Sequence, residues 1–158
     1  MYYKNIKKFK SMDDYIQNNL NKKKTYLKQI EKYAKNKKVI ECGCGTAKIS
    51  TYFQNNGYDV SAVDIDNEII DLAKYIVKNS TYKDSPKFYN MSIMNMNFKN
   101  KEFDVAFSNG VLEHFKNDEI IKILKEKCRI AKFVIFGVPS KYFDKKEYMY
   151  GDERYLTR

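Results

Sequence analysis

Short apolar runs in this chain alternate with segments in which apolar residues recur every three or four positions. The continuous runs predict buried strands at residues 39–42, 58–64, 87–92, 103–109 and 132–138. The periodic segments between them predict amphipathic helices. One of these ends at "NNG", where Gly57 suits the position after a helix C-terminus. The next begins after Asp66, a favoured N-cap residue.

The last predicted helix begins near Asn117, and four of its residues are expected to face the core: Ile120, Ile121, Leu124 and Cys128. Strands that alternate with helices and are apolar along their whole length are typical of a parallel sheet covered on both faces. We therefore predict an α/β fold of the Rossmann-like, doubly wound type. Its mostly parallel sheet of about five strands forms the middle of a three-layer αβα arrangement.

The basic character of the chain is concentrated at its N-terminus. Residues 1–38 contain 12 lysines and three acidic residues, which gives +9 of the total charge of +10. Within this stretch Leu20, Leu27, Ile30 and Ala34 recur at helical spacing. We interpret residues 1–38 as a basic helical segment and residues 39–158 as a ligand-binding domain, C-terminally short, within one domain overall.

Two explanations of the basic segment remain open. Charged helix surfaces are ordinarily solvated faces, and we favour this explanation because arginine, which makes bidentate phosphate contacts, occurs only three times. The alternative is an electrostatic handle for a nucleic acid or another polyanion.

Composition also bounds the location of the protein. The apolar runs are too short to span a bilayer, and the charged N-terminus "MYYKNIKKFK" lacks the apolar region of a signal peptide. Three cysteines do not make a disulfide framework. Cys42 and Cys44 lack the second pair that a structural metal site needs. We expect a cytoplasmic protein with no membrane association and no metal.

The stretch "ECGCGTAKIS", residues 41–50, has the pattern of a strand that turns through glycines into a helix. It lacks the Gly-Lys-Ser/Thr end of a P-loop, and Lys48 stands where a dinucleotide-binding loop has its third glycine. Glu41 would repel a pyrophosphate and suits an ammonium or sulfonium group. Glu41 has a second interpretation, as a cap of the helix that follows.

A second acid follows the next strand. Asp64 lies 21 residues after Gly43, where a carboxylate accepts hydrogen bonds from ribose hydroxyls; the alternative is a turn residue only. The carboxyl ends of parallel strands meet at one edge of a sheet, which would bring together Gly43, Asp64, Ser92 and Asn109. A cationic adenosine ligand without phosphate fits both acids, and S-adenosylmethionine is such a ligand.

Four stretches in order carry a resemblance to a known family: "VIECGCGTA", "VSAVDID", "FYNMSIMNMNF" and "FDVAFSNGVLEHF". Between about Val39 and Pro139 the chain resembles the class I S-adenosylmethionine-dependent methyltransferases, in particular their small bacterial members. Two positions depart from the family pattern. Ala47 replaces the last glycine of the loop, and Ser92 stands where the family usually has an acid that contacts the adenine amine.

The resemblance implies a role for each of eight residues. Gly43 and Gly45 let the backbone approach the methionine moiety, while Glu41 lies near its ammonium group. Asp64 holds the ribose. Ile65, Ser92 and Ile93 lie on the adenine side, and Asn109 contributes its carbonyl at the methionine end. The product of the cofactor would be S-adenosylhomocysteine.

The acceptor is less directly indicated. His114, the only histidine, is a candidate base, with a structural role such as pairing with Glu113 as the alternative. The chain has no Asn/Asp-Pro-Pro-aromatic motif after the fourth predicted strand and no Pro-Cys pair. These absences disfavour methylation of nucleic-acid amines and of cytosine C5, so we expect a small-molecule acceptor.

Three alternatives remain beside that expectation. One is a catalytically silent S-adenosylmethionine-binding subunit that needs a partner chain, and another is an RNA-directed methyltransferase that uses the basic N-terminus. A nucleotide-binding Rossmann domain is a weaker third, because Glu41 and Lys48 argue against it.

The chain after the fifth predicted strand is short for this family. Residues 140–158 leave no room for the antiparallel hairpin that usually closes the sheet. The fifth strand would then be an exposed edge, which proteins avoid. We expect a homodimer or a partner subunit to cover it.

Overall fold

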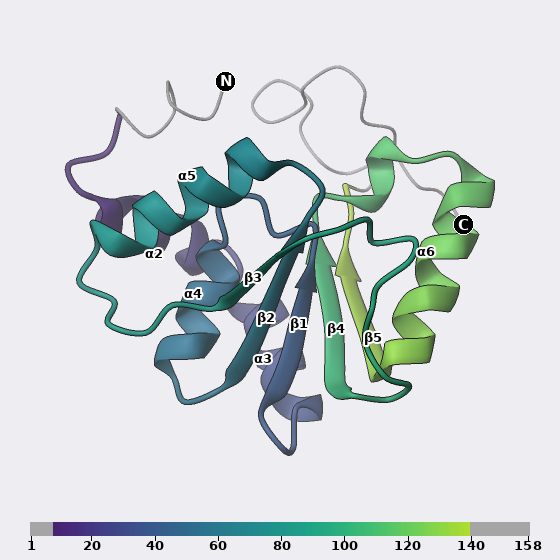
Figure 1. Ribbon diagram of the computed structural model, residues 1–158. Coiled ribbons are helices and arrows are strands. Elements are labelled where there is room, and N and C mark those ends of the chain that lie inside the picture. Colours follow the sequence, from purple (N-terminus) through teal and green to yellow (C-terminus); the bar gives the residue numbers. More distant parts are fainter. Residues whose placement is uncertain (1–7, 140–158) are drawn as a thin grey trace.

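The computed structural model describes residues 8–139, which form an α/β fold around one parallel sheet (Figure 1). The strands are β1 (Lys38–Cys42), β2 (Asp59–Asp64), β3 (Lys87–Asn90), β4 (Phe103–Asn109) and β5 (Ala131–Gly137). Their order in the sheet is β3-β2-β1-β4-β5, and every neighbouring pair is parallel. The predicted fold class is confirmed. The strand order reverses at β1, and ligands of such sheets bind beside that reversal.

Helices cover both faces of the sheet. They are α2 (Met12–Asn21), α3 (Lys24–Tyr33), α4 (Lys48–Asn55), α5 (Asn67–Lys78) and α6 (Asn117–Ile130), with a 3-10 turn η1 (Leu112–His114) before α6. On one face, buried residues of α2, α3, α4 and α5 pack with Val39, Val60 and Phe107. On the other, α6 and the segment after β3 pack against Ile40 and Ala106. Figure 1 shows α3 behind the sheet and α6 at its right.

The N-terminal segment contains two helices instead of one continuous periodic stretch. Ser11 caps the start of α2 through its hydroxyl, which accepts a hydrogen bond from the Asp14 N–H. The N–H of Lys23 donates to the Leu20 carbonyl, which turns the chain before α3 starts. The predicted apolar residues all remain buried: Leu20, Leu27, Ile30 and Ala34.

The predicted inner face of α6 was partly wrong. Ile121 and Cys128 are exposed, whereas Ile123, Lys127 and Ile130 are buried. These three residues follow the spacing of four and three positions that defines one helix face. The pattern of apolar residues did not indicate this face, because one of its three buried residues is a lysine.

β5 forms one end of the described sheet, where within residues 8–139 it pairs only with β4. Phe133 and Phe136 on this strand are each 45% exposed. The predicted absence of a closing hairpin concerns residues 140–158 and lies outside the described residues. Of the helices in the described range, none is both long and apolar enough to cross a membrane.

Candidate functional site

The loop after β1 is shaped by glycines in two different ways. The N–H groups of Gly43 and Cys44 donate to the Val63 carbonyl at 2.8 and 2.9 Å, which ties the loop to β2. Gly43 has a φ of +78°, and an added Cβ would lie 2.8 Å from a methyl carbon of Val111. Gly45 has a φ of +52°, but its added Cβ would meet no atom within 4 Å. Packing therefore requires Gly43, whereas Gly45 borders open space that a ligand can approach.

Glu41 is buried at the end of β1, and its carboxylate faces the first turn of α4. Its Oε2 accepts hydrogen bonds from the N–H of Ser50 at 3.0 Å and from the Ser50 hydroxyl at 2.6 Å. Burial raises the pKa of Glu41 to about 7, although the Ser50 bonds and the charges of Lys23 and Lys48 oppose that rise. Glu41 therefore caps α4 through one of its two carboxylate oxygens, as its second interpretation predicted.

Asp64 joins the glycine loop to the next strand. Its Oδ2 accepts a hydrogen bond from the Gly45 N–H at 2.9 Å, and its Oδ1 accepts one from the Asp66 N–H at 3.2 Å. Asp66 caps α5 as predicted, accepting from the N–H groups of Glu68 and Ile69. Ile65 between the two acids is 72% exposed, which leaves an apolar surface beside a carboxylate.

The segment after β3 lies next to the end of β2. The side-chain amide of Asn90 donates to the Ile65 carbonyl at 2.8 Å, and the N–H of Met91 donates to the Asp64 carbonyl at 3.1 Å. Ser92 is partly exposed, and its hydroxyl accepts from the Met94 N–H at 3.2 Å. Ile93 is buried. The structure therefore brings Ser92 and Ile93 to the same edge of the sheet as Asp64 and Ile65.

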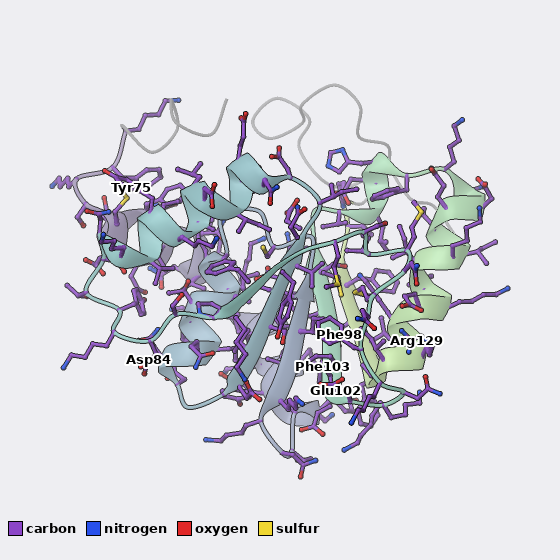
Figure 2. The ribbon with its side chains drawn as sticks, in the orientation of Figure 1. Tyr75, Asp84, Phe98, Glu102, Phe103 and Arg129 are labelled. Carbon is purple, nitrogen blue, oxygen red and sulfur yellow. The ribbon has the colours of Figure 1, made fainter. Side chains whose placement is uncertain are left out.

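Arg129 on α6 holds the segment that carries Ser92 and Ile93, a role that sequence reasoning missed. It donates to the carbonyls of Met96 and Phe98, each at 2.7 Å, and to Glu126. Figure 2 shows Arg129 beside Phe98 and Phe103, whose rings meet edge to face at 5.1 Å. The one sequence feature that could have drawn attention to Arg129 is the rarity of arginine in this chain.

The end of β4 carries the remaining predicted residues. Asn109 is partly exposed at the strand end, and the N–H of Gly110 donates to the Gly137 carbonyl on β5. The 3-10 turn η1 follows, with Glu113 buried and His114 exposed.

Two tyrosines from the N-terminal helices also reach this edge of the sheet. The Tyr15 hydroxyl lies 3.1 Å from the Thr46 hydroxyl of the glycine loop, and the Tyr26 hydroxyl donates to the Ser108 carbonyl at 2.7 Å. Ser108 also accepts from the buried Lys127 Nζ at 2.6 Å. The charge and the apolar spacing of the N-terminal segment give no indication of these tyrosine contacts.

The two loop cysteines are buried thiols. Burial raises the pKa of Cys42 to about 11 and raises the pKa of Cys44 as well. No group of three or more His, Cys, Asp or Glu side chains suited to a metal ion occurs within residues 8–139. Because their pKa values are raised, both thiols stay protonated at neutral pH and are poor nucleophiles.

The fold and this edge are typical of domains that bind an adenosine-containing ligand, and the match to a known family decides between them. A Rossmann-like parallel sheet in which a glycine loop after β1 meets an acid at the end of β2 is shared by dinucleotide-binding domains and the class I S-adenosylmethionine-dependent methyltransferases. Residues 40–133 match the sequence model of a family described as "Methyltransferase domain". The chain belongs to this family, whose cofactor is S-adenosylmethionine, and the predicted family and cofactor are confirmed.

Similar proteins cover only parts of this chain. The human "eEF1A lysine and N-terminal methyltransferase" is 31% identical over 103 residues, which are 64% of this chain and 14% of the human protein. The structure of the PH0226 protein from Pyrococcus horikoshii OT3 is 25% identical, with a TM-score of 0.66 over 76% of this chain and 58% of the other.

Two further structures show the same fold. A S-adenosylmethionine-dependent methyltransferase from Methanosarcina mazei is 27% identical, with a TM-score of 0.56 over 60% of this chain and 47% of that one. A magnesium protoporphyrin IX methyltransferase from Synechocystis PCC 6803 with bound S-adenosylmethionine is 20% identical. Its TM-score is 0.57 over 69% of this chain and 52% of that one. The chain thus spans less than two thirds of each of these relatives.

Proposed function

We propose that this chain binds S-adenosylmethionine at the carboxyl edge of the sheet and transfers its methyl group to a small molecule. The hydrogen bond from the Gly45 N–H to Asp64 is the observation that supports binding at this edge, whereas the small-molecule acceptor is supported by the absence of the two nucleic-acid motifs from the sequence. It joins the glycine loop to the acid at the next strand end, beside the open space over Gly45 and the exposed Ile65. A ligand with a ribose, a flat aromatic ring and a cationic group suits these neighbours.

The residues that would hold the cofactor follow the edge from β1 to β3. Gly43 and Gly45 allow the backbone to come close to the methionine moiety, and the second carboxylate oxygen of Glu41 serves its ammonium group. Asp64 accepts hydrogen bonds from the ribose hydroxyls. The adenine packs on Ile65, with Ser92 and Ile93 at its edge. Asn109 offers its backbone carbonyl at the methionine end.

Bound S-adenosylmethionine supplies an activated methyl group on a sulfonium sulfur. The task of the chain is to orient the acceptor in line with that methyl group and to remove a proton where the acceptor carries one. We assign the removal of this proton to His114, which is exposed on η1 just after β4. Replacing His114→Gln should lower kcat while leaving the affinity for S-adenosylmethionine unchanged. A structural role would weaken both.

The acceptor class is tested by transfer of a labelled methyl group. Purified protein is incubated with S-adenosylmethionine that carries a tritiated methyl group, together with separated small-molecule, protein and nucleic-acid fractions of a cell extract. Label in the small-molecule fraction supports the proposal, and label confined to nucleic acid contradicts it. That second result would favour the RNA-directed alternative, in which the basic N-terminal segment contacts the phosphates.

A protein amine is a second candidate acceptor. The human relative, 31% identical over the matched stretch, is named for methylation of a lysine and an N-terminus. Label in the protein fraction would support this candidate over a small molecule. Binding of the cofactor with no transfer to any fraction would favour the silent subunit, whose partner would lie along the exposed Phe133 and Phe136 of β5.

A further inference from the structure

The solvent-facing side of α3 carries a row of lysines. Lys24, Lys28 and Lys32 follow one another at intervals of four positions, which places them on one side of the helix. All three are exposed, and none forms an ion pair with a carboxylate in the part of the chain that the structure describes. Like charges at this spacing, about 6 Å along the helix axis, destabilise a helix. We refer to these three residues as the lysine row.

The other surface helices do not share this excess of positive charge. α5 contains two acidic and two basic residues, and α6 contains three acidic and four basic residues. α2 has two acidic residues and no basic one. In α3 the three lysines stand against Glu31 alone, whose carboxylate accepts a hydrogen bond from the Tyr52 hydroxyl of α4 at 3.2 Å. The abundance of lysine in the whole chain therefore does not explain the lysine row, because it would raise the positive charge of every helix.

An aromatic pair lies at the C-terminal end of the lysine row. The Lys32 Nζ lies 5.3 Å from the centroid of the Tyr33 ring, and that centroid lies 4.7 Å from the ring centroid of Phe133 on β5. Phe133 is 45% exposed, so part of an aromatic surface faces solvent beside the last lysine. Surfaces that bind single-stranded nucleic acids combine these two features, because lysines contact the phosphates and aromatic rings stack on the bases.

The lysine row extends toward the carboxyl edge of the sheet. The Tyr26 hydroxyl near the start of α3 donates to the Ser108 carbonyl at the end of β4. Tyr33 at the end of α3 packs instead on Phe133, which lies opposite Val105 of β4. α3 therefore runs in the opposite direction to β4, behind the sheet in Figure 1, with the first lysine of the row nearest the carboxyl edge.

We propose that the lysine row and the Tyr33–Phe133 pair bind a single-stranded nucleic acid, with phosphates along the lysines and a base on the exposed side of Phe133. A polyanion without bases would use the lysines but not the ring. The inference goes beyond the proposed function and does not depend on it, because the surface contains none of the residues assigned to S-adenosylmethionine. It also does not depend on the identity of the methyl acceptor.

The test measures binding of fluorescently labelled oligouridine and oligothymidine, each of about 12 nucleotides, to the full chain by fluorescence anisotropy at several salt concentrations. One triple variant replaces Lys24, Lys28 and Lys32 by glutamine. The matched control replaces the exposed lysines 78, 122 and 125 of α5 and α6 by glutamine, which removes the same net charge elsewhere. Thermal unfolding and titration with S-adenosylmethionine show that each variant is folded.

A second pair of variants tests the aromatic ring. Phe133→Leu removes the ring but keeps an apolar side chain. Phe136→Leu is its control, because Phe136 is also 45% exposed but, three positions further along β5, lies on the opposite face of the sheet. Phe133→Leu should lower the affinity for both probes by roughly fivefold or more, since the stacking of one base is lost, and Phe136→Leu should leave it unchanged.

The wild-type chain should bind both probes, and the α3 triple variant should bind them at low salt at least roughly tenfold more weakly. Its plot of log affinity against log salt should be shallower by about two, because three phosphate contacts are lost. The control triple variant should keep most of the affinity. No binding by the wild type overturns the inference, and so do equal losses in the two triple variants or equal affinities of Phe133→Leu and Phe136→Leu.

Discussion

The carboxylate of Asp64 accepts a hydrogen bond from the Gly45 N–H, although 19 positions separate the two residues. The parallel pairing of β1 with β2 produces this contact, because Cys42 lies opposite Val63 and both strands end at the same edge. The Val63 carbonyl then accepts from two loop N–H groups. The glycine loop and the acidic strand end are therefore one structural unit, which a ligand would meet as a single surface.

Replacing the two loop glycines by alanine should affect different properties, stability at Gly43 and ligand binding at Gly45. Gly43→Ala places a Cβ against Val111 at a positive φ, so we expect it to lower the free energy of unfolding by about 2 kcal/mol or more. Val111→Ala in the same chain should recover part of that loss. Chemical denaturation measures both effects, and an unchanged midpoint for Gly43→Ala would contradict the described packing.

Gly45→Ala should act on binding more than on stability. Its Cβ meets no protein atom, so the stability loss is limited to the strain of a positive φ, about 1 kcal/mol. The methyl group occupies the open space above the loop, and calorimetry should show a fall in S-adenosylmethionine affinity of at least roughly tenfold. Unaltered affinity would place the ligand elsewhere.

Glu41 should make the protein less stable as the pH rises toward neutrality. Its pKa is about 7 in the folded state against 4.5 for an ordinary glutamate. Between these values the folded chain retains a proton that the unfolded chain releases, so the free energy of unfolding falls by about 3 kcal/mol across that window. Below pH 4.5 the contribution is fully present, and above pH 7 it is lost.

Glu41→Gln isolates this effect, because glutamine keeps an acceptor for Ser50 but does not titrate. Denaturation of both proteins from pH 4 to pH 8 should give a stability difference that grows in favour of the variant as the pH rises. A constant difference across this range would show that Glu41 is already ionised when buried. Burial lowers the pKa of Lys48 to about 8, at the upper limit of this range, and loss of its proton raises stability with pH, which is opposite in sign to the effect of Glu41.

Lys127 should destabilise the protein at neutral pH. It is fully buried with a hydrogen bond to Ser108 and no carboxylate partner among the described ion pairs. Burial lowers its pKa, so the free energy of unfolding falls as the pH drops below the unfolded value of 10.5. Lys127→Met should raise stability at pH 7 by about 1 kcal/mol or more. A destabilised variant would mean that the hydrogen bond to Ser108 outweighs the burial of the amine.

Arg129 should control the mobility of the segment that carries Ser92 and Ile93. Lysine cannot reproduce the planar fork that contacts Met96, Phe98 and Glu126. Arg129→Lys should therefore lower the free energy of unfolding by about 2 kcal/mol and speed hydrogen exchange across residues 91–100. Lys122→Ala on the exposed side of α6 is the control. Equal exchange in the two variants would contradict this role.

The order of strands and helices was predictable because buried parallel strands are continuous apolar runs. The strand ends were predictable for the same reason, and with them the edge shared by Gly43, Asp64 and Asn109. The burial of Lys127 and the contacts of Arg129 were not predictable, because a charged residue in a helical pattern gives no sign of being buried or of which distant groups it contacts. The contacts of Tyr15 and Tyr26 depend on how α2 and α3 pack over the loop, and a local pattern does not encode such long-range packing.

Isothermal titration of the chain with S-adenosylmethionine, S-adenosylhomocysteine and NAD is the most direct test of the proposed site. We predict binding of the first two with dissociation constants on the order of micromolar, no binding of NAD, and loss of binding in Asp64→Ala. Asp71→Ala, which removes an exposed carboxylate from α5, should bind as the wild type does. Binding of NAD, or full affinity for S-adenosylmethionine in Asp64→Ala, would contradict the assignment of this edge.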